Sequence, residues 1–446
     1  FFFHADPGIR DPLWSRGLGD VYKRQILKRM MDLHPKVIDL TLDRVFSLLE
    51  ALNSPHKKLP AVIHIAGTNG KGSTLSMIRA GLESSGRSVH TYTSPHLIRF
   101  NERIRLAGKL ITETELSQLL DECYEANAGK EITYFEITTC AAMLAMSRKN
   151  ADYTLLEVGL GGRLDATNVV EKPALSVITP ISFDHEQFLG SSIEKIASEK
   201  AGIIKRNTPV VISLQNEQAL KIIEDRALEL NAPIYSYGKN WLAWEERGRL
   251  IYQDGQGLLD LPYPNLAGGH QIINAGCALQ TLRLLDNGLI KNFDSVTTNA
   301  SWPARMQKLK DGLLNKLYPS AEIWLDGGHN PAAGEAIAAH LSKLKPRPTY
   351  AICGMLNTKD IKGFMNPLSS QIDKLFGISI PEENNTLSGH ETSQEAANVG
   401  MVSNSCDSLE SAFKLIKQHS ENPRIIICGS LYLAGHVLAL QKYEIN

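Results

Sequence analysis

The chain has 446 residues, of which 43% are hydrophobic and 21% are charged. This length and composition predict two or three soluble globular domains. Lys and Arg together number 47 against 48 Asp and Glu, and this balance argues against nucleic acid or an anionic membrane as the main partner. The six cysteines are dispersed, and no apolar run is long enough to span a membrane. We therefore expect reduced thiols and a cytoplasmic location.

The first 25 residues differ from the rest of the chain. Charges and prolines follow the apolar start at once, so a signal-peptide core is not present. Residues 8–25 have neither a helical nor a strand period, and they resemble translated sequencing-adapter sequence. We expect residues 1–25 to be non-native, with a disordered native leader as the alternative.

A regular pattern begins after Gln25. Hydrophobic residues at 40, 45, 48, 49 and 52 share one helical face, and Pro55 ends that segment. The apolar run 61–66 predicts a strand that leads directly into Gly67. Residues 73–85 then predict a helix that ends at Gly86.

The turn between this strand and helix reads Gly67-Thr-Asn-Gly-Lys-Gly-Ser-Thr74. Its glycines let backbone N–H groups approach phosphate oxygens, and the helix N-terminus adds positive potential. Lys71 can reach the β- and γ-phosphates of ATP, and the hydroxyl of Ser73 or Thr74 can meet Mg²⁺. Gly72 separates Lys71 from Ser73, so the spacing departs from the G-x-x-x-x-G-K-[ST] loop. The structural alternative is a turn that packs a helix close to a strand.

Alternating strands and helices continue beyond the loop. Strands are predicted at residues 153–158, 175–180 and 209–212. This alternation predicts a mostly parallel sheet covered on both faces by helices. Residues 241–261 contain short, polar-interrupted runs that predict an antiparallel side sheet, and residues 270–285 predict a helix.

A domain boundary is predicted at residues 299–305, where Trp302 and Pro303 interrupt the pattern. Beyond it, strands are predicted at 321–325, 349–353, 374–378 and 424–428, and helices at 331–344, 360–371, 408–418 and 431–441. We therefore predict an α/β fold of two domains. Residues 26–300 form a P-loop parallel-sheet ATPase domain with a small antiparallel side sheet, and residues 304–446 form a smaller Rossmann-like α/β domain.

Three polar residues follow predicted strands of the first domain. Glu157 ends the run 153–156, at the strand edge where ligands gather in open α/β sheets, and its oxygens suit Mg²⁺. A solvated strand-end carboxylate or a helix cap is the alternative. His185 follows the next strand, although a lone histidine is more often structural and Mg²⁺ prefers oxygen. Ser94 follows a strand predicted at residues 88–92 and precedes a proline, and such serines are usually turn formers.

Several segments resemble, in order, motifs of the folylpolyglutamate synthase/dihydrofolate synthase family of Mur ligases. The resemblance covers the chain from Ile26 to the C-terminus. The segments that carry it are residues 67–74, 94–97, 100–104, 134–136, 157–168, 184–185, 199–203, 326–331 and 429–435.

The resemblance implies an ATP-dependent carboxylate–amine ligase. ATP would phosphorylate the carboxylate of dihydropteroate or of a reduced folate, and the amine of L-glutamate would displace the phosphate. The implied cofactors are ATP and Mg²⁺, with two metal sites and K⁺ as a further candidate ion. Residues 26–300 would be the Mur ligase-type ATP-binding domain, and residues 304–446 the glutamate ligase domain. Family precedent implies a monomer without nucleic acid or membrane partners.

The resemblance also implies metal-binding and catalytic residues. Ser94, Glu157 and His185 would hold the metal, and Lys71 and His329 would act on the phosphates. Lys200, which would otherwise be taken for a solvated helix lysine, would be carbamylated by CO₂. That reaction needs a neutral amine, and therefore a pKa depressed by burial or by neighbouring cations. For His329 the alternative is a helix N-terminal histidine.

By the same resemblance, further residues contact the substrates. ATP would be bound by Thr68, Asn69, Gly70, Lys71, Gly72, Ser73, Asn274, Arg305 and Asp326. The pterin or folate would be bound by Ile38, Asp39, Leu40, Thr133, Tyr134, Phe135, Glu136 and Leu164. Phe135 can stack on a flat ring and Glu136 can accept its hydrogen bonds, although Phe135 as plain core is an equal alternative. The family often has glycine where this chain has Ala304.

Two other functions are alternatives to the folate ligase. A Mur-type ligase acting on a UDP-linked peptidoglycan precursor carries an additional N-terminal domain. Here only about 40 residues separate the suspect leader from Gly67, fewer than an independent domain usually needs. A nucleotide-gated binding module without ligase chemistry is disfavoured by the metal-binding set Ser94, Glu157 and His185.

Overall fold

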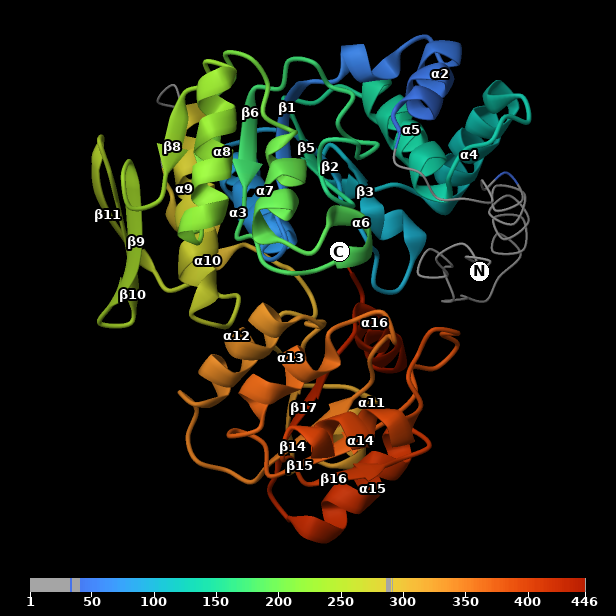
Figure 1. The fold of residues 1–446 in the computed structure, drawn as a ribbon, viewed down its shortest axis with the longest axis vertical. Helices are drawn as coiled ribbons and strands as arrows, with labels where there is room; N and C mark the ends of the chain where they lie inside the picture. Colours follow the sequence, from blue (N-terminus) through green and yellow to red (C-terminus); the bar gives the residue numbers. More distant parts are fainter. Residues whose placement is uncertain (1–32, 34–40, 286–289, 291, 446) are drawn as a thin grey trace.

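The computed structural model describes residues 33, 41–285, 290 and 292–445, which form two lobes, each built around its own sheet (Figure 1). The leader at residues 1–25 lies outside the described residues, as do Ile38, Asp39 and Leu40. Within the described part of the chain, no helix is both long and apolar enough to cross a membrane.

An eight-stranded sheet forms the centre of the first lobe, in the order β4-β3-β2-β5-β1-β6-β7-β8. Neighbouring strands from β2 to β8 run parallel, and β3 and β4 form an antiparallel edge. The strands are β1 Ala61–Ala66, β2 Val89–Tyr92, β3 Ile104–Leu106, β4 Lys109–Leu110, β5 Tyr153–Glu157, β6 Leu175–Ile178, β7 Val210–Ile212 and β8 Ile234–Ser236.

Helices cover both faces of this sheet because successive strand side chains point to opposite faces. Ile63 and Ile65 of β1 pack with α3 and α9, whereas Val62 packs with α2, α4 and α5. On that second face, α7 and α8 cover β6 and β7. The principal helices are α2 Asp43–Ala51, α3 Lys71–Ser84, α4 Glu113–Asn127, α5 Tyr134–Ser147, α7 Ile193–Ala201, α8 Glu217–Glu229 and α9 His270–Leu285.

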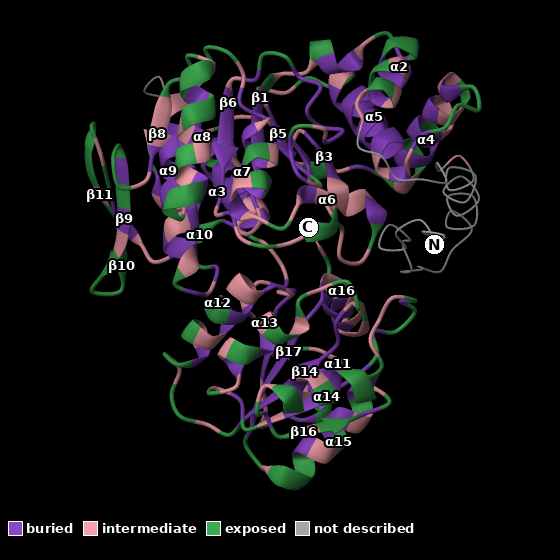
Figure 2. Ribbon diagram, viewed as in Figure 1, coloured by how far each residue is buried: buried purple, intermediate pink, exposed green. Residues whose placement is uncertain are grey.

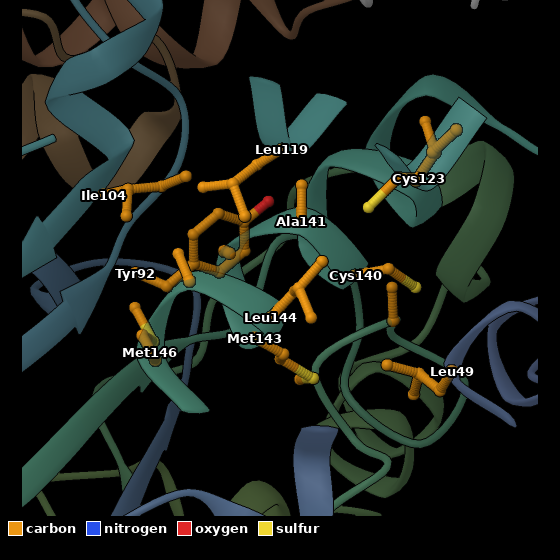
Figure 3. Close-up of a cluster of buried hydrophobic side chains, with 14 of the residues drawn as sticks. Leu49, Tyr92, Ile104, Leu119, Cys123, Cys140, Ala141, Met143, Leu144 and Met146 are labelled. Carbon is orange, nitrogen blue, oxygen red and sulfur yellow. The ribbon is translucent and has the colours of Figure 1, made fainter. Parts of the chain in front are cut away.

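Helix α5 is buried along most of its length (Figure 2). Its side chains Cys140 and Leu144 lie among Leu49 of α2, Cys123 of α4 and Tyr92 of β2 (Figure 3). Thr133 starts the helix with a capping box, in which its hydroxyl accepts the Glu136 N–H and the Glu136 carboxylate accepts the Thr133 N–H. The first turn of this buried helix is thereby held in one position.

The side sheet lies at one end of the first lobe (Figure 1). Its antiparallel strands are β9 Trp241–Glu246, β10 Arg249–Asp254 and β11 Gly257–Pro262. Trp241 and Tyr252 are fully buried there, in the core that includes α9. The short helix α10 Asp294–Thr298 packs against α3.

A six-stranded sheet in the order β12-β13-β17-β14-β15-β16 forms the second lobe, and all its pairs are parallel except β12–β13. The strands are β12 Gln307–Leu309, β13 Glu322–Leu325, β14 Thr349–Cys353, β15 Lys374–Gly377, β16 Ser403–Ser405 and β17 Arg424–Cys428. The helices are α11 Leu313–Leu317, α12 Pro331–Leu341, α13 Ile361–Met365, α14 Gly389–Asn398, α15 Leu409–His419 and α16 Leu431–Leu440.

These two sheets and the side sheet confirm the predicted fold class. One predicted helix is shorter than expected. Instead of a single helix over residues 360–371, α13 ends at Met365 and a 3-10 turn spans Asn366–Leu368. Pro367 lacks the N–H that would continue an α-helical ladder.

Candidate active site

Two adjoining cavities lie where the lobes meet. The larger has a volume of about 590 Å³. It is lined by residues 67–73, which we call the glycine loop, by the carboxyl ends of β5 and β6, and by residues 326–330 of the second lobe. The smaller, about 440 Å³, is lined by the start of α5 and by residues of both lobes. Ser94, His185, His329 and Asn330 line both cavities, so the two spaces meet at these residues.

The glycine loop joins β1 to α3 at the floor of the larger cavity. Gly70 is the N-cap of α3 with φ 82°, a conformation that favours glycine, and a Cβ there would lie 2.4 Å from the Asn274 side chain. Lys71 folds back over the loop, and its Nζ donates to the carbonyl oxygens of Gly67 at 3.1 Å and Thr68 at 3.3 Å. Backbone N–H groups and the Lys71 ammonium together suit a polyphosphate.

The structure separates the two hydroxyls considered for the metal. Ser73 lines the larger cavity, whereas Thr74 is fully buried and is not among its lining residues. Of the two, Ser73 is therefore placed to meet a ligand of the loop.

Ser94, Glu157 and His185 all line the larger cavity. Glu157 is buried at the end of β5, and its Oε2 accepts the Ser94 N–H at 3.1 Å. Burial raises the pKa of Glu157, while Lys71, the Ser94 N–H and Arg305 act in the opposite direction. The three residues thus line one cavity, and the carboxylate and hydroxyl oxygens among them are the ligand type that a hard divalent cation prefers.

Lys200 projects from α7 and is buried beneath the same loop. Its Nζ donates to the carbonyl oxygen of Gly67 at 3.0 Å. Burial first, and Lys71 second, lower its pKa to about 7, although Asp184 and Asp165 oppose the shift. The neutral amine that carbamylation requires is therefore accessible near neutral pH.

Asn274, Arg305 and Asp326 also line the larger cavity. Asp326 is buried and accepts the N–H of Met306 at 2.7 Å, which joins the end of β13 to the linker between the lobes. Burial raises the pKa of Asp326, and nearby Arg305 opposes this. Ala304 has φ 56°, a left-handed conformation that glycine would adopt at lower cost.

The smaller cavity contains the residues predicted to bind a pterin ring that lie within the described chain. Thr133, Tyr134, Phe135, Glu136 and Leu164 all line it. Phe135 stacks against Tyr92, with ring centroids 6.2 Å apart. It is half-buried, so it serves the core and the cavity wall together.

The carboxylate of Glu136 already accepts hydrogen bonds from other groups of the protein. Besides capping α5, its Oε1 and Oε2 accept two hydrogen bonds from Arg44, at 2.9 and 3.0 Å. Its predicted contact with a pterin would have to share these oxygens.

Comparisons with known proteins agree over most of the chain. The Mur ligase middle domain matches residues 65–282, and the dihydrofolate synthetase C-terminal domain matches residues 314–440. The dihydrofolate synthase/folylpolyglutamate synthase of Haemophilus influenzae is 33% identical over 433 residues, which cover 91% of this chain and 94% of that protein. The chain belongs to the dihydrofolate synthase/folylpolyglutamate synthase family.

Solved structures of this family have the same fold. E. coli FolC in complex with DHPP and ADP superposes with a TM-score of 0.85 at 30% identity, covering 94% of this chain and 97% of that one. A bifunctional folylpolyglutamate synthase/dihydrofolate synthase with Mn, AMPPNP and L-glutamate bound gives 0.80 at 31% identity, covering 93% and 96%. This member of the family is thus an ATP-dependent ligase.

In this ligase, second-lobe residues reach the first lobe through Asp184, a residue to which sequence reasoning gave no role. Lys359 Nζ donates to its Oδ1 at 2.7 Å, Asn330 Nδ2 donates to its Oδ2 at 3.2 Å, and His329 Nε2 lies 3.6 Å from Oδ2. Burial alone would raise the pKa of Asp184, but His329, His185 and Lys359 hold it well below its usual range.

Asn330 also contacts the glycine loop of the ligase. Its Nδ2 donates to Asn69 Oδ1 at 3.1 Å. The sequence held one signal for Asp184, its place beside His185 after a strand. Lys359 similarly follows β14. Their pairing was not predictable from spacing, since 175 positions separate them.

Proposed function

We propose that this ligase adds L-glutamate to dihydropteroate, to reduced folates, or to both, through an acyl phosphate. A carboxylate oxygen of the acceptor attacks the γ-phosphorus of ATP and ADP leaves. The amine of L-glutamate then attacks the acyl carbon, the phosphate leaves, and the nitrogen loses its proton. The junction of the two cavities at Ser94, His185 and His329 carries this proposal, because it lets the phosphate end of ATP meet the acceptor carboxylate.

We assign the larger cavity to ATP. The N–H groups and side chains of residues 68–73 surround the phosphates, and the Lys71 ammonium neutralises the transferring phosphoryl group. Arg305 and Asp326 contact the nucleotide from the linker and the second lobe, and Asn274 contacts it from α9. His329 approaches the phosphates from the second lobe.

Ser94, Glu157 and His185 would hold Mg²⁺, with a second Mg²⁺ and K⁺ as further ions of the same region. When bound, a divalent cation would supply charge neutralisation between two anions that must react. Lys200 would join this group as a carbamate: its neutral amine forms a bond to the carbon of CO₂ and loses a proton. A lysine thereby becomes a carboxylate-like group beside the metals.

We assign the smaller cavity to the acceptor, with the pterin near Phe135, Glu136 and Leu164. Thr133 and Tyr134, together with Ile38, Asp39 and Leu40 from outside the described residues, complete the proposed pterin site. We further propose a monomer that works in the cytoplasm. Its six free, buried cysteines suit a reducing compartment.

The test is ADP release in the presence of ATP, Mg²⁺ and L-glutamate, with dihydropteroate or tetrahydrofolate as the acceptor. We expect release that requires both glutamate and an acceptor. Lys71→Ala should abolish it, while the exposed Lys58→Ala should not. Release that occurs only with a UDP-linked precursor, or with neither folate acceptor, would overturn the proposal.

A further inference from the structure

Arg103 lines the smaller cavity and has no part in the chemistry described above. It is the last residue of the 3-10 turn Phe100–Arg103 and precedes β3. Its backbone is fixed there, because its carbonyl oxygen accepts the Thr93 N–H at 2.9 Å, next to Ser94. Arg103 therefore stands close to the junction of the two cavities.

The guanidinium of Arg103 is held on two sides. Its Nε donates to Nδ1 of His96 at 2.8 Å, and its Cζ lies 4.9 Å from the ring centroid of the buried Phe100. These contacts fix the guanidinium plane but engage neither of the two terminal nitrogens. Among the described residues, those nitrogens have no hydrogen-bond or ion-pair partner.

Arg103 differs from the lysine that lines the smaller cavity, because Arg103 has no oppositely charged partner among the described residues. The described lysines and arginines of its lining are Arg103 and Lys359, and Lys359 is already paired with Asp184 at 2.7 Å. The buried carboxylates of the same lining are satisfied as well. Glu136 is paired with Arg44, and Asp165 accepts hydrogen bonds from backbone N–H groups. Arg103 is thus a cation with a planar pair of free donors, which is the arrangement that binds a carboxylate in a bidentate manner.

We propose that the two terminal nitrogens of Arg103 bind the non-reacting carboxylate of a glutamyl tail on the acceptor. This inference rests on the proposed function and adds a specificity-determining residue to it. Dihydropteroate has one carboxylate, which is the reacting group, so it offers Arg103 nothing to bind. A glutamyl acceptor has a second carboxylate, and Arg103 would select for it.

The acceptor is a better occupant than the incoming L-glutamate because of where Arg103 is anchored. Phe100, on which its guanidinium lies, makes an edge contact with Tyr134 at 5.8 Å between centroids. Tyr134 belongs to the start of α5, the wall assigned to the acceptor ring. Lys359, the other cation of the described lining, comes from the second lobe and is already paired with Asp184.

The experiment compares two ligands that differ by the glutamyl group. The dissociation constants of tetrahydrofolate and tetrahydropteroate are measured by calorimetry on the full chain, for wild type, Arg103→Gln and Arg103→Lys. For Arg103→Gln we expect tetrahydrofolate binding to weaken by about 10- to 100-fold, the loss typical of a charge-assisted contact. Tetrahydropteroate binding should weaken by less than about threefold. Arg103→Lys keeps the charge without the planar fork and should fall between.

Arg99→Gln is the matched control, because Arg99 is exposed on the same loop and lines neither cavity. Equal weakening for both ligands in Arg103→Gln would overturn the proposal, as would a change confined to the KM for L-glutamate. A wild type that releases ADP with dihydropteroate but does not bind tetrahydrofolate would overturn it too, while leaving the ligase function intact. Failure of both acceptors in the wild type would instead refute the proposed function.

Discussion

The reactivity proposed for Lys200 would arise from its burial. On a solvated helix face this lysine would stay protonated, but here its Nζ contacts the carbonyl oxygen of Gly67 and its pKa falls to about 7. The lowered value disfavours the charged form, so the neutral amine becomes dominant as the pH rises through about 7. Only that form can add to CO₂.

We therefore predict that the ligase needs CO₂ and that this need depends on pH. In CO₂-depleted buffer, added bicarbonate should raise the rate of ADP release at about pH 8 and should lose its effect below about pH 6, where Lys200 is protonated. Lys200→Gln should not respond at any pH, while the exposed Lys195→Gln on the same helix should respond like wild type. A wild-type rate that ignores CO₂ throughout this range would contradict the assignment.

At the scale of elements, the loop that carries Ser94 depends on one carboxylate. Glu102 accepts the backbone N–H groups of Leu97 at 2.8 Å, Ile98 at 3.1 Å and Arg99 at 2.6 Å. These bonds hold in place an irregular segment between β2 and β3. Because the same segment presents Ser94 to both cavities, its order should determine metal binding.

We predict that Glu102→Gln weakens the affinity for the divalent cation without abolishing the fold. Both carboxylate oxygens accept these N–H groups, and the amide replaces one of them with an NH2 group that cannot accept, at a cost of about 1–2 kcal/mol for the set. The Mg²⁺ concentration that gives half-maximal ADP release should therefore rise about tenfold. Glu115→Gln, an exposed position in the first turn of α4, is the control. An unchanged Mg²⁺ requirement would mean that the loop is ordered by other contacts.

Elements with a strong local signal could be predicted closely. The strand at 61–66 and the helix at 270–285 have the bounds that their apolar runs indicated. Helix α5 was missed as a separate element because it is buried on nearly all sides and so lacks an amphipathic period. The β3–β4 edge is too short to leave a pattern. The local sequence thus predicted the central strands of the sheet better than its short edge strands and the buried helix α5.

At the scale of the whole molecule, the candidate site could be predicted only in part. The loop and Glu157 were indicated by local pattern, and Lys200, Asn274 and Arg305 came only from the family resemblance. The bridge of Asp184 with Lys359 and Asn330 exists only when the two lobes meet, and nothing local in either segment encodes it. Pairings of this kind depend on the closure of the cleft rather than on spacing.

This bridge should also control how the lobes sit relative to each other. Asp184 and Lys359 are each only 11% exposed, and Lys359 is the ammonium that compensates the Asp184 charge. Lys359→Met would remove one of the cationic partners of that carboxylate, which should destabilise the closed arrangement by about 1–3 kcal/mol. Since about 1.4 kcal/mol is a tenfold change in an equilibrium, the open form should become substantially populated.

We predict that Lys359→Met increases the radius of gyration measured by small-angle X-ray scattering on the ligand-free protein, and that Asp184→Asn does the same. Lys362→Met is the matched control, because Lys362 is exposed on α13 and its partner Glu395 lies within the second lobe. Scattering isolates the bridge from any part that Lys359 plays in turnover, since it needs no substrate. If Lys359→Met loses activity but scatters like wild type, Lys359 acts on a substrate and the lobes are held together by their other contacts.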